Sequence, residues 1–186
     1  MLLFVGLGNP TPVSENNRHN VGFKIIDSIN KKFSLSKQKP KFKGLLTTGI
    51  VGDQKVYAIK PLTFMNNSGI CIRELIEYFK IDAEDVIVFH DDLDVEFGKI
   101  KAKFGGSSAG HNGIASIDKF IGKDYSRVRI GIGKPKGSIE IADYVLQNFD
   151  EEESISVEKV LSDITDSISI LVEKKLDLFS STINNK

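Results

Sequence analysis

Several residue types that build common kinds of site are scarce in this chain. Its 186 residues include a single cysteine, Cys71, which excludes an internal disulfide and a cysteine-based zinc site. The longest apolar runs are only as long as a strand, so the sequence predicts neither a membrane span nor a secretory signal. Aromatic residues make up 9% and are not interleaved with cations, which argues against a surface that stacks on nucleic-acid bases. We expect a soluble, cytoplasmic protein.

Charge is balanced over the whole chain but not along it. The 25 basic and 25 acidic side chains give no net charge, which argues against a strong, general nucleic-acid binder. Residues 140–186 hold 11 of the acidic and 4 of the basic side chains, so the preceding part carries a net charge of +7. This asymmetry is compatible with an anionic partner near the N-terminal part, although a solvated acidic helix is its commoner cause.

Apolar patterns along the chain alternate between those of strands and those of helices. Strands are expected at 2–7, 44–51, 56–60, 86–89, 99–104 and 128–132. Helices are expected at 21–33, 70–79, 112–121, 138–149 and 152–175. The alternation predicts a single-domain α/β fold over residues 1–186, a three-layer α/β/α sandwich with a mixed, mostly parallel central sheet. Residues 180–186 are polar, and we expect them to fray.

Residues 85–113 concentrate polar groups after a buried strand. His90, Asp91, Asp92 and Asp94 directly follow the apolar run 86–89, at the carboxyl end of the predicted sheet, where open α/β sheets bind ligands. The glycines between 105 and 113 would let the main chain approach a ligand closely. An acidic surface turn followed by a flexible loop is the ordinary alternative.

Two other loops that follow strands carry further candidate residues, and the fold type predicts that the three loops meet at one edge of the sheet. Together they supply imidazoles, a carboxylate and carboxamides. A histidine oriented by a carboxylate is a general base near neutral pH, and carboxamides can hold a substrate or stabilise an oxyanion. The chain has no G-x-S-x-G nucleophile elbow, so water is the expected attacker. The residues concerned are Asn9, His19, Asn66, Asp91, His111 and Asn112.

The histidines also have ordinary structural explanations. His19 could bond loop carbonyls, His90 could be buried and neutral, and His111 could simply begin a helix. A second alternative concerns Gly6 and Gly8, which resemble the start of a dinucleotide fingerprint. The third glycine of that fingerprint is missing and no helix follows at once, so we do not expect a nicotinamide or flavin cofactor.

Cations alternate along two predicted strands. Lys99, Lys101 and Lys103 would project from one face, and Arg127 and Arg129 lie at alternate positions of another strand. A solvated sheet face is the ordinary reading of such a pattern. The same arrangement could instead form a phosphate clamp, whose contacts would give salt-dependent affinity.

Six segments of this chain form an ordered set of motifs: GLGNP (6–10), RHNVG (18–22), PLTFMNNSG (61–69), HDDLD (90–94), GHNG (110–113) and RVRIGIGKP (127–135). In their order and spacing, over roughly residues 2 to 180, they resemble bacterial peptidyl-tRNA hydrolases. The resemblance implies a monomeric esterase that needs no metal or cofactor and that cleaves the ester between a peptide and the 3′-terminal ribose of tRNA, so that the tRNA can be reused in translation.

The resemblance also implies roles for individual residues. His19 matches the general base and Asp91 its partner. Lys103 and Arg129 match the residues that grip the 5′-phosphate of the tRNA. The remaining matches are expected to position the substrate or line the site: Asn9, Phe64, Met65, Asn66, His111 and Asn112.

Two rival functions remain open from the sequence. A non-catalytic RNA-binding relative of the same fold is one, although the presence of both His19 and Asp91 argues against it. The other is a metal-dependent hydrolase that would use Asp91, Asp92 and Asp94, since hard cations prefer carboxylate oxygens. Nearby aspartates alone are weak evidence for such a metal site.

Overall fold

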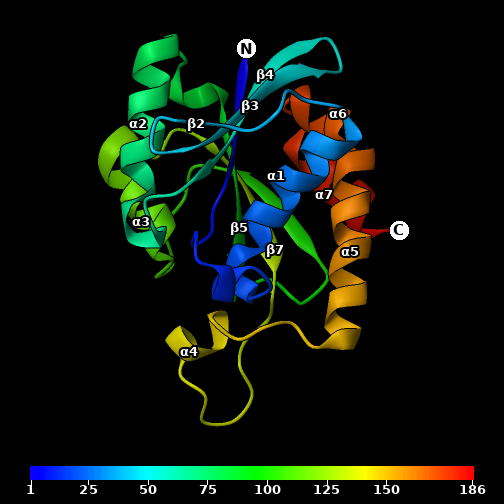
Figure 1. The fold of residues 1–186 in the computed structure, drawn as a ribbon. Helices are drawn as coiled ribbons and strands as arrows, with labels where there is room; N and C mark the ends of the chain where they lie inside the picture. The colour runs from blue at the N-terminus through cyan, green and yellow to red at the C-terminus, as the bar shows by residue number, and fades with distance from the viewer.

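One seven-stranded sheet runs through the computed structural model, which describes residues 1–186 (Figure 1). In the sheet the strands lie in the order β2-β3-β4-β1-β5-β7-β6. The central strands β4, β1, β5 and β7 are parallel, whereas β2, β3 and β6 run antiparallel to their neighbours. The mixed, centrally parallel sheet is as predicted. The strands are β1 (Leu2–Gly6), β2 (Lys39–Lys41), β3 (Gly44–Val51), β4 (Gln54–Pro61), β5 (Val86–Asp92), β6 (Ile100–Phe104) and β7 (Ser126–Gly131).

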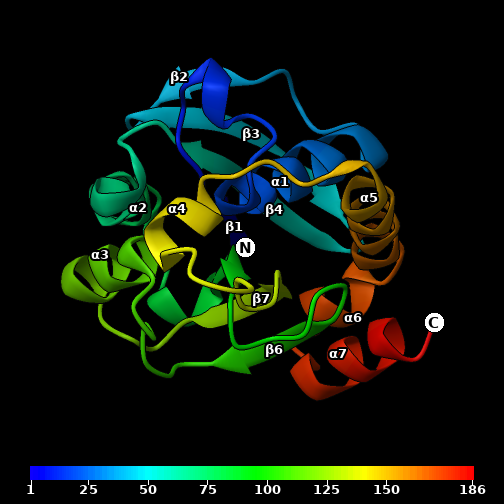
Figure 2. The same cartoon turned by 90° about the horizontal axis from the view of Figure 1, so that it is seen from below.

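Helices cover both faces of this sheet, which confirms the three-layer α/β/α architecture. Helices α2 and α3 lie on one face, and α1, α5, α6 and α7 lie on the other (Figures 1 and 2). None of the helices combines the length and hydropathy that crossing a membrane requires. The helices are α1 (Val21–Lys32), α2 (Ser68–Phe79), α3 (Asn112–Ile121), α4 (Ile141–Val145), α5 (Glu151–Asp166), α6 (Ile168–Val172) and α7 (Leu176–Asn184).

Strand β1 is apolar at every position because each of its faces belongs to a separate core. On β1, Leu2 and Phe4 belong to the larger core, beneath α1, α5, α6 and α7, while Leu3 and Val5 belong to the core beneath α2 and α3. Successive strand residues point to opposite faces, so a strand buried on both sides needs an uninterrupted apolar run. Cys71 is completely buried in the second core, where it acts as a small apolar residue.

Close backbone packing places the start of α1 directly on the ends of β1 and β5. A side chain at Gly6 would meet the carbonyl oxygen of Gly22 at 2.2 Å, and one at Gly22 would meet the carbonyl oxygen of Phe89 at 2.5 Å. Only glycine permits such an approach. The turn that precedes α1 is therefore held at the carboxyl end of the sheet.

Three predicted elements differ from the structure. β5 does not end at Phe89 but continues to Asp92, because His90, Asp91 and Asp92 pair with β7. The helix expected at 138–149 is confined to α4, which buries none of its residues. The helix expected at 152–175 is interrupted at Ser167, where α5 ends and α6 begins.

The prediction that residues 180–186 fray is wrong, because α7 continues to Asn184. Phe179 and Ile183 are buried, and they anchor one side of α7 in the larger core. The polar side chains bind the outer edge of β6. Asn184 accepts a hydrogen bond from the amide of Ile100 and donates one to its carbonyl, and Ser180 accepts one from the amide of Ala102. The polarity that suggested fraying therefore caps an exposed strand edge.

Candidate active site

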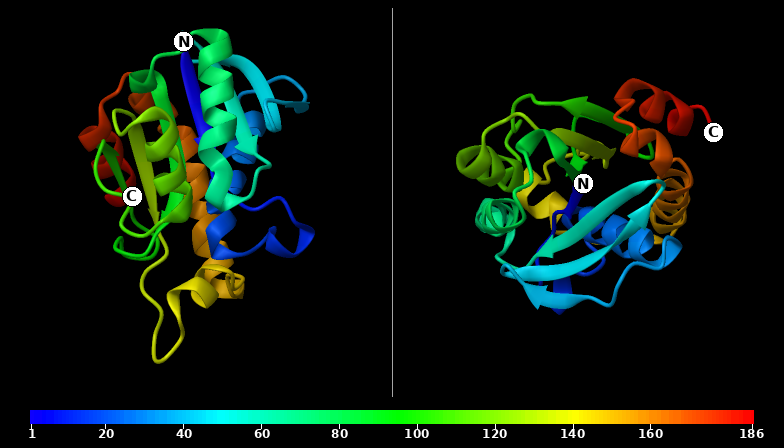
Figure 3. Two further views of the ribbon diagram at one scale, coloured as in Figure 1. Left: turned by 90° about the vertical axis from the view of Figure 1, so that its left-hand side faces the viewer. Right: turned by 90° about the horizontal axis from the view of Figure 1, so that it is seen from above.

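The carboxyl ends of the parallel strands form one end of the molecule, and α4 lies across it (Figure 2). The connection from β7 to α5, which carries α4, extends beyond this end of the sheet (Figure 3). Two short turns also reach it, η2 (Arg18–Asn20) before α1 and η3 (Met65–Asn67) before α2. Two adjoining hollows of about 370 Å³ and about 440 Å³ open there. Residues that line both are His19, Asn112, Ala142 and Val145.

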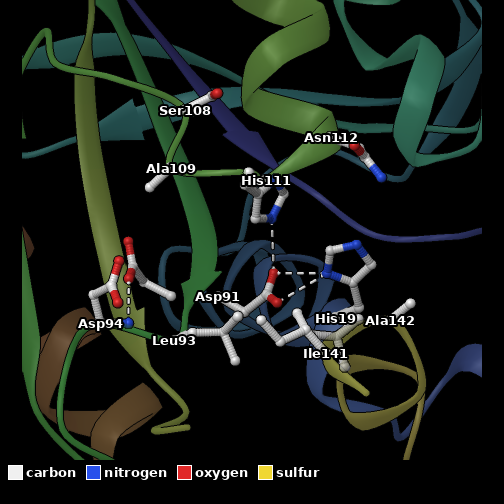
Figure 4. Close-up of a pocket in the computed structure, with 13 residues that line it drawn as sticks. His19, Asp91, Leu93, Asp94, Ser108, Ala109, His111, Asn112, Ile141 and Ala142 are labelled. Carbon is white, nitrogen blue, oxygen red and sulfur yellow. Dashed lines mark hydrogen bonds and ion pairs between the residues drawn. The ribbon is translucent and has the colours of Figure 1, made fainter.

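Asp91 is the centre of a buried polar cluster at this end. Its side chain is 3% exposed, and its carboxylate meets two imidazoles (Figure 4). His19 Nδ1 lies 2.8 Å from Oδ2, and His111 Nε2 lies 2.9 Å from Oδ1. An ionised carboxylate only accepts hydrogen bonds, so both ring nitrogens donate. The structure thus brings together His19 and Asp91, which are 72 residues apart in the chain.

The two histidines hold the Asp91 carboxyl in its charged form. Burial by itself raises the pKa of Asp91, but the electrostatic effect of the neighbouring His111 and His19 and the hydrogen bonds from both rings lower it by more. The net effect keeps the pKa well below its usual range. Asp91 is therefore a charged acceptor that fixes the orientation of both rings.

His19 presents its second nitrogen to the cavity. Because Nδ1 donates to Asp91, the neutral ring carries a lone pair on Nε2. Nε2 has no hydrogen-bond partner in the protein, and Figure 4 shows it turned away from Asp91. His19 lines both hollows, so this nitrogen is available to a water molecule. This is the arrangement of a general base.

His111 has a different set of partners. Its Nδ1 accepts hydrogen bonds from the amides of Gly113 and Ile114, which makes it the N-cap of α3. Its Nε2 therefore carries the proton that is donated to Asp91. Both ring nitrogens are occupied within the protein, although His111 lines the first hollow, so the substrate contact expected for it stays a prediction. His111 is thus both the N-cap of α3 and a member of the polar cluster around Asp91.

His90 is buried and neutral, as one of the sequence alternatives held. Its Nδ1 donates to the carbonyl oxygen of Asp91 at 2.7 Å, and its Nε2 is buried without a partner. Burial and the neighbouring His111 lower the pKa of His90 to about 3, although Asp91 partly opposes them. His90 therefore packs beneath the cluster without reaching the cavity.

A network of asparagines holds the turns on the other side of His19. Asn20 accepts a hydrogen bond from the amide of Asn9 and donates one to its carbonyl, each at 2.9 Å. Asn9 Oδ1 in turn accepts from the amide of Met65 at 2.9 Å. This leaves the amide nitrogen of the Asn9 side chain to face the second hollow, which Asn9 lines. Asn20 is a residue that the sequence analysis did not single out.

The Asn9–Met65 bond stabilises an unusual backbone conformation at the rim. Phe64 has φ 64° and ψ 158°, a region that residues other than glycine rarely adopt. Its side chain is 54% exposed, while Met65 is buried. Asn66 and Asn112 are exposed. Phe64, Met65, Asn66 and Asn112 all line the second hollow beside His19, as the sequence led us to expect.

Comparisons of the whole chain with known proteins lead to the same family as the six motifs. Residues 3–186 match the family model of peptidyl-tRNA hydrolase. The chain belongs to this family. A peptidyl-tRNA hydrolase from Pelagibacter ubique (strain HTCC1062) is 80% identical over 186 residues, and the match covers both chains completely. One from Bacillus subtilis (strain 168) is 46% identical over 162 residues, which is 87% of this chain and 86% of that protein.

The fold also matches a solved structure of the family. The crystal structure of peptidyl-tRNA hydrolase from Acinetobacter baumannii has a TM-score of 0.92 and 31% sequence identity to this chain. The match covers 99% of this chain and 94% of that chain. The arrangement of strands and helices is thus that of peptidyl-tRNA hydrolases.

The cations that were considered as a phosphate clamp fall into two groups. Strand pairing places Lys101 opposite Arg129 and Lys103 opposite Arg127, so all four lie on one face of the sheet. Arg127 is buried and bonded to Asp118 and to the carbonyl of Ser107, which withdraws it from any ligand. Lys103 is exposed without an ionic partner. Of these cations, Lys101, Lys103 and Arg129 remain available to an anionic ligand.

Arg129 is only partly free. Its Nε donates to Asp92 Oδ2 at 2.7 Å, and its side chain is 20% exposed. Burial raises the pKa of Asp92, but the hydrogen bond from Arg129 helps to lower it by more, so the pKa lies below its usual value. The Nε bond leaves the terminal nitrogens of the guanidinium group for a second anion.

Asp91, Asp92 and Asp94 do not converge on one point, as the metal-dependent alternative would require. Asp91 meets the histidines, Asp92 meets Arg129, and Asp94 lies 3.6 Å from Lys134. A different set of donor atoms, from His19, Asp91 and His111, lies within 4.8 Å of one another. That set does not suit a metal, because the backbone amides at Nδ1 of His111 keep its proton on Nε2, the atom that would bind.

Sequence reasoning also missed the wall that α4 provides. Ile141, Ala142 and Val145 line the first hollow, and Ala142, Val145 and Leu146 line the second. The signal was present, since these residues lie in the segment that was predicted as a helix. What the pattern did not indicate is that apolar residues of this short helix line the two hollows, while only Tyr144 and Val145 also pack against the larger core.

Proposed function

We propose that this protein hydrolyses the ester bond between a peptide and the 3′-terminal ribose of tRNA and thereby releases the tRNA for reuse. The observation that carries the proposal is the pair formed by His19 and Asp91, with the second nitrogen of His19 free at two hollows. Membership of the peptidyl-tRNA hydrolase family supports the choice of substrate.

In the proposed mechanism His19 Nε2 removes a proton from water, and the resulting hydroxide attacks the ester carbonyl. Asp91 holds the tautomer that this step requires and stabilises the imidazolium that forms. His19 then returns the proton to the departing ribose oxygen. An aminoacyl ester is already activated, so no covalent intermediate and no metal are needed.

The carboxamides are proposed to hold the substrate. Asn9, Asn66 and Asn112 surround His19 and can bind the peptide main chain, and an amide donor can stabilise the developing oxyanion. Phe64 and Met65 supply an apolar wall. Recognition of the main chain would let one enzyme act on many peptides. His111 serves this chemistry indirectly, since it donates a second hydrogen bond to the Asp91 carboxylate.

Lys103 and Arg129 are proposed to bind the 5′-phosphate of the tRNA. Both lie on the same face of the sheet, with Lys103 exposed and two nitrogens of Arg129 unpaired in the protein. Contacts to phosphate carry no sequence information, which suits an enzyme for many tRNAs. Because this substrate forms during translation, we further propose that the protein acts in the cytoplasm. We also propose that it is a monomer, as the resemblance to the family implies.

The proposal is tested by incubating the purified protein with an N-acetylated aminoacyl-tRNA and measuring release of the N-acetyl amino acid. We expect turnover by the native protein, with and without EDTA, and none by His19→Ala. Loss of activity in EDTA would favour the metal-dependent alternative. Tight tRNA binding without turnover would instead favour the non-catalytic RNA-binding relative.

A further inference from the structure

The wall formed by α4 is anchored only in part by its own residues. The helix has 5 residues, none of which is buried, yet Ala142 and Val145 line both hollows beside His19. Tyr144 and Val145 are half-buried against the larger core, and the Tyr144 hydroxyl donates to the carbonyl oxygen of Ile132 at 2.7 Å. Because a short helix of this kind has little intrinsic stability, its position also depends on contacts made by the segments around it.

Arg18, the residue before His19, makes those contacts. Its guanidinium group donates to the carbonyl oxygens of Gln147 and Asn148, at 3.3 and 3.0 Å. The other terminal nitrogen lies 3.1 and 2.9 Å from the two carboxylate oxygens of Glu153, in the first turn of α5. The Arg18 side chain thus joins the turn that carries His19 to residues 147–148, which follow α4, and to the first turn of α5.

Aromatic and backbone contacts reinforce this junction. The guanidinium carbon of Arg18 lies 4.3 Å from the centre of the Tyr144 ring and 5.6 Å from that of Phe149. The amide of Arg18 donates to Gln147, and the amide of Phe149 donates to Asn16. The Arg18 side chain is only 8% exposed, so its charge depends on Glu153 for compensation.

We propose that Arg18 is a positioning residue, which together with Glu153 holds residues 141–149 against the turn that carries His19. The inference rests on the proposed function, since what is positioned is the wall of the substrate cavity relative to the base. It predicts that loosening the pair weakens substrate binding more than the proton transfer. The Asp91–His19 bond does not pass through residues 141–149, so the chemical groups stay in place.

A guanidinium group suits this position because it is planar and presents several donors at once. Lysine offers one point charge and cannot serve two carbonyls and a carboxylate in one plane. Arg18→Lys should therefore fail to replace arginine, although it preserves the charge. Glu153→Gln keeps the shape of the partner and removes its charge. Because Glu153 is 26% exposed, this variant is expected to fold even if Arg18→Met does not.

The experiment measures kcat and KM for N-acetyl-aminoacyl-tRNA hydrolysis in Arg18→Met, Arg18→Lys and Glu153→Gln. The matched control is Arg73→Met, which breaks the exposed pair between Arg73 and Glu77 on α2. We expect KM to rise by roughly tenfold in Arg18→Met, with smaller rises in the other two, because breaking a buried pair leaves an uncompensated charge. We expect kcat to change by less than about threefold and the control to match the native protein.

Hydrogen exchange provides a second measurement that does not depend on activity. The amides of Arg18 and Phe149 should exchange at least about tenfold faster in Glu153→Gln, whereas amides of β5 should not change. A structural role without a link to the cavity would lower stability and leave KM unchanged in the folded variants, which would overturn the proposal. Unchanged exchange at both amides would also overturn it.

The two proposals fail in distinguishable ways. If the native protein does not hydrolyse the substrate, the proposed function fails, and faster exchange in Glu153→Gln would still show that the pair holds residues 141–149. If the native protein is active and KM and exchange are unchanged in Glu153→Gln and Arg18→Lys, only the role of Arg18 fails.

Discussion

Two charged regions of the molecule satisfy their charges in opposite ways. In the cluster around Asp91 the carboxylate is buried and bonded to two rings, and only Nε2 of His19 is left open to the cavity. On the face formed by β6 and β7, Lys101 and Lys103 are exposed and have no ionic partner. The cluster around Asp91 is held rigidly by hydrogen bonds and leaves one nitrogen unpaired. The face formed by β6 and β7 carries unpaired cations on side chains that few contacts hold in place.

The difference shows which property each region contributes. A general base works through the orientation and protonation of one nitrogen, so its neighbours must be fixed and its charges compensated. A surface that attracts an RNA backbone works through the number of unpaired cations and is weakened by salt. Substitutions in the two regions should therefore change different measured quantities.

The largest effect is expected for His19→Ala, which removes the only open nitrogen of the cluster. We expect kcat to fall by on the order of 10³ to 10⁴, because a positioned general base contributes about that much. Affinity for tRNA should change little. Steady-state kinetics and a filter-binding assay measure the two quantities. A variant with near-native kcat would contradict the role of His19.

A smaller loss is expected for Asp91→Asn, which keeps the shape of the side chain. The carboxamide can no longer accept from both rings with a negative charge, so the tautomer of His19 is no longer fixed. We expect kcat to fall by roughly 10², within the range that general acid–base catalysis supplies, with KM nearly unchanged. Equal changes in tRNA binding and kcat would show that Asp91 acts on RNA after all.

On the cationic face, Lys103→Ala should weaken tRNA binding by about tenfold at low salt and make the salt dependence shallower by about one phosphate contact. Arg129→Gln should behave similarly while it keeps a donor for Asp92. Lys37→Ala removes the same charge from an exposed connection elsewhere and serves as the control. Identical salt slopes for Lys103→Ala and Lys37→Ala would argue against a clamp.

The smallest effect concerns stability at mildly acidic pH. His90 has a pKa lowered to about 3 in the folded protein, well below the ordinary value for histidine, so the unfolded chain binds the extra proton between these values. The stability that the protein gains by keeping His90 neutral is fully present above about pH 6.5. It is lost as the pH falls toward 3, because the unfolded chain binds the proton first. Urea titrations should show a loss of roughly 2 kcal/mol between pH 6.5 and 5, which His90→Gln should reduce. If the free energy of unfolding depends on pH equally in His90→Gln and in the native protein, this prediction is wrong.

Local patterns were sufficient to predict the sheet and most of the helices. The strand at Leu2 and the first four residues of the strand at Val86 are uninterrupted apolar runs, as expected for a sheet that is covered on both faces. The motifs also indicated which residues surround His19. They did not indicate that His111 caps α3 and also binds Asp91, because that contact depends on how β5 and α3 are placed in space.

The remaining errors have a common origin in tertiary contacts made by polar side chains. Arg18 was read only as part of a motif, since nothing in the sequence near it points to Glu153, 135 residues away. The end of the chain was expected to fray because its polar residues have no partner nearby in sequence. Their partners lie on β6, which is more than 75 residues earlier.

The helix α7 stands where an eighth strand would otherwise add to the sheet. Ser180 and Asn184 offer the outward-facing groups of Ile100 and Ala102 the same kind of bonds that a neighbouring strand would supply. Helix α7 thus prevents a further strand from pairing with β6, so the sheet ends at this strand. Without them, two copies could join edge to edge through β6, and the cationic face that lies on this strand would be drawn into the contact.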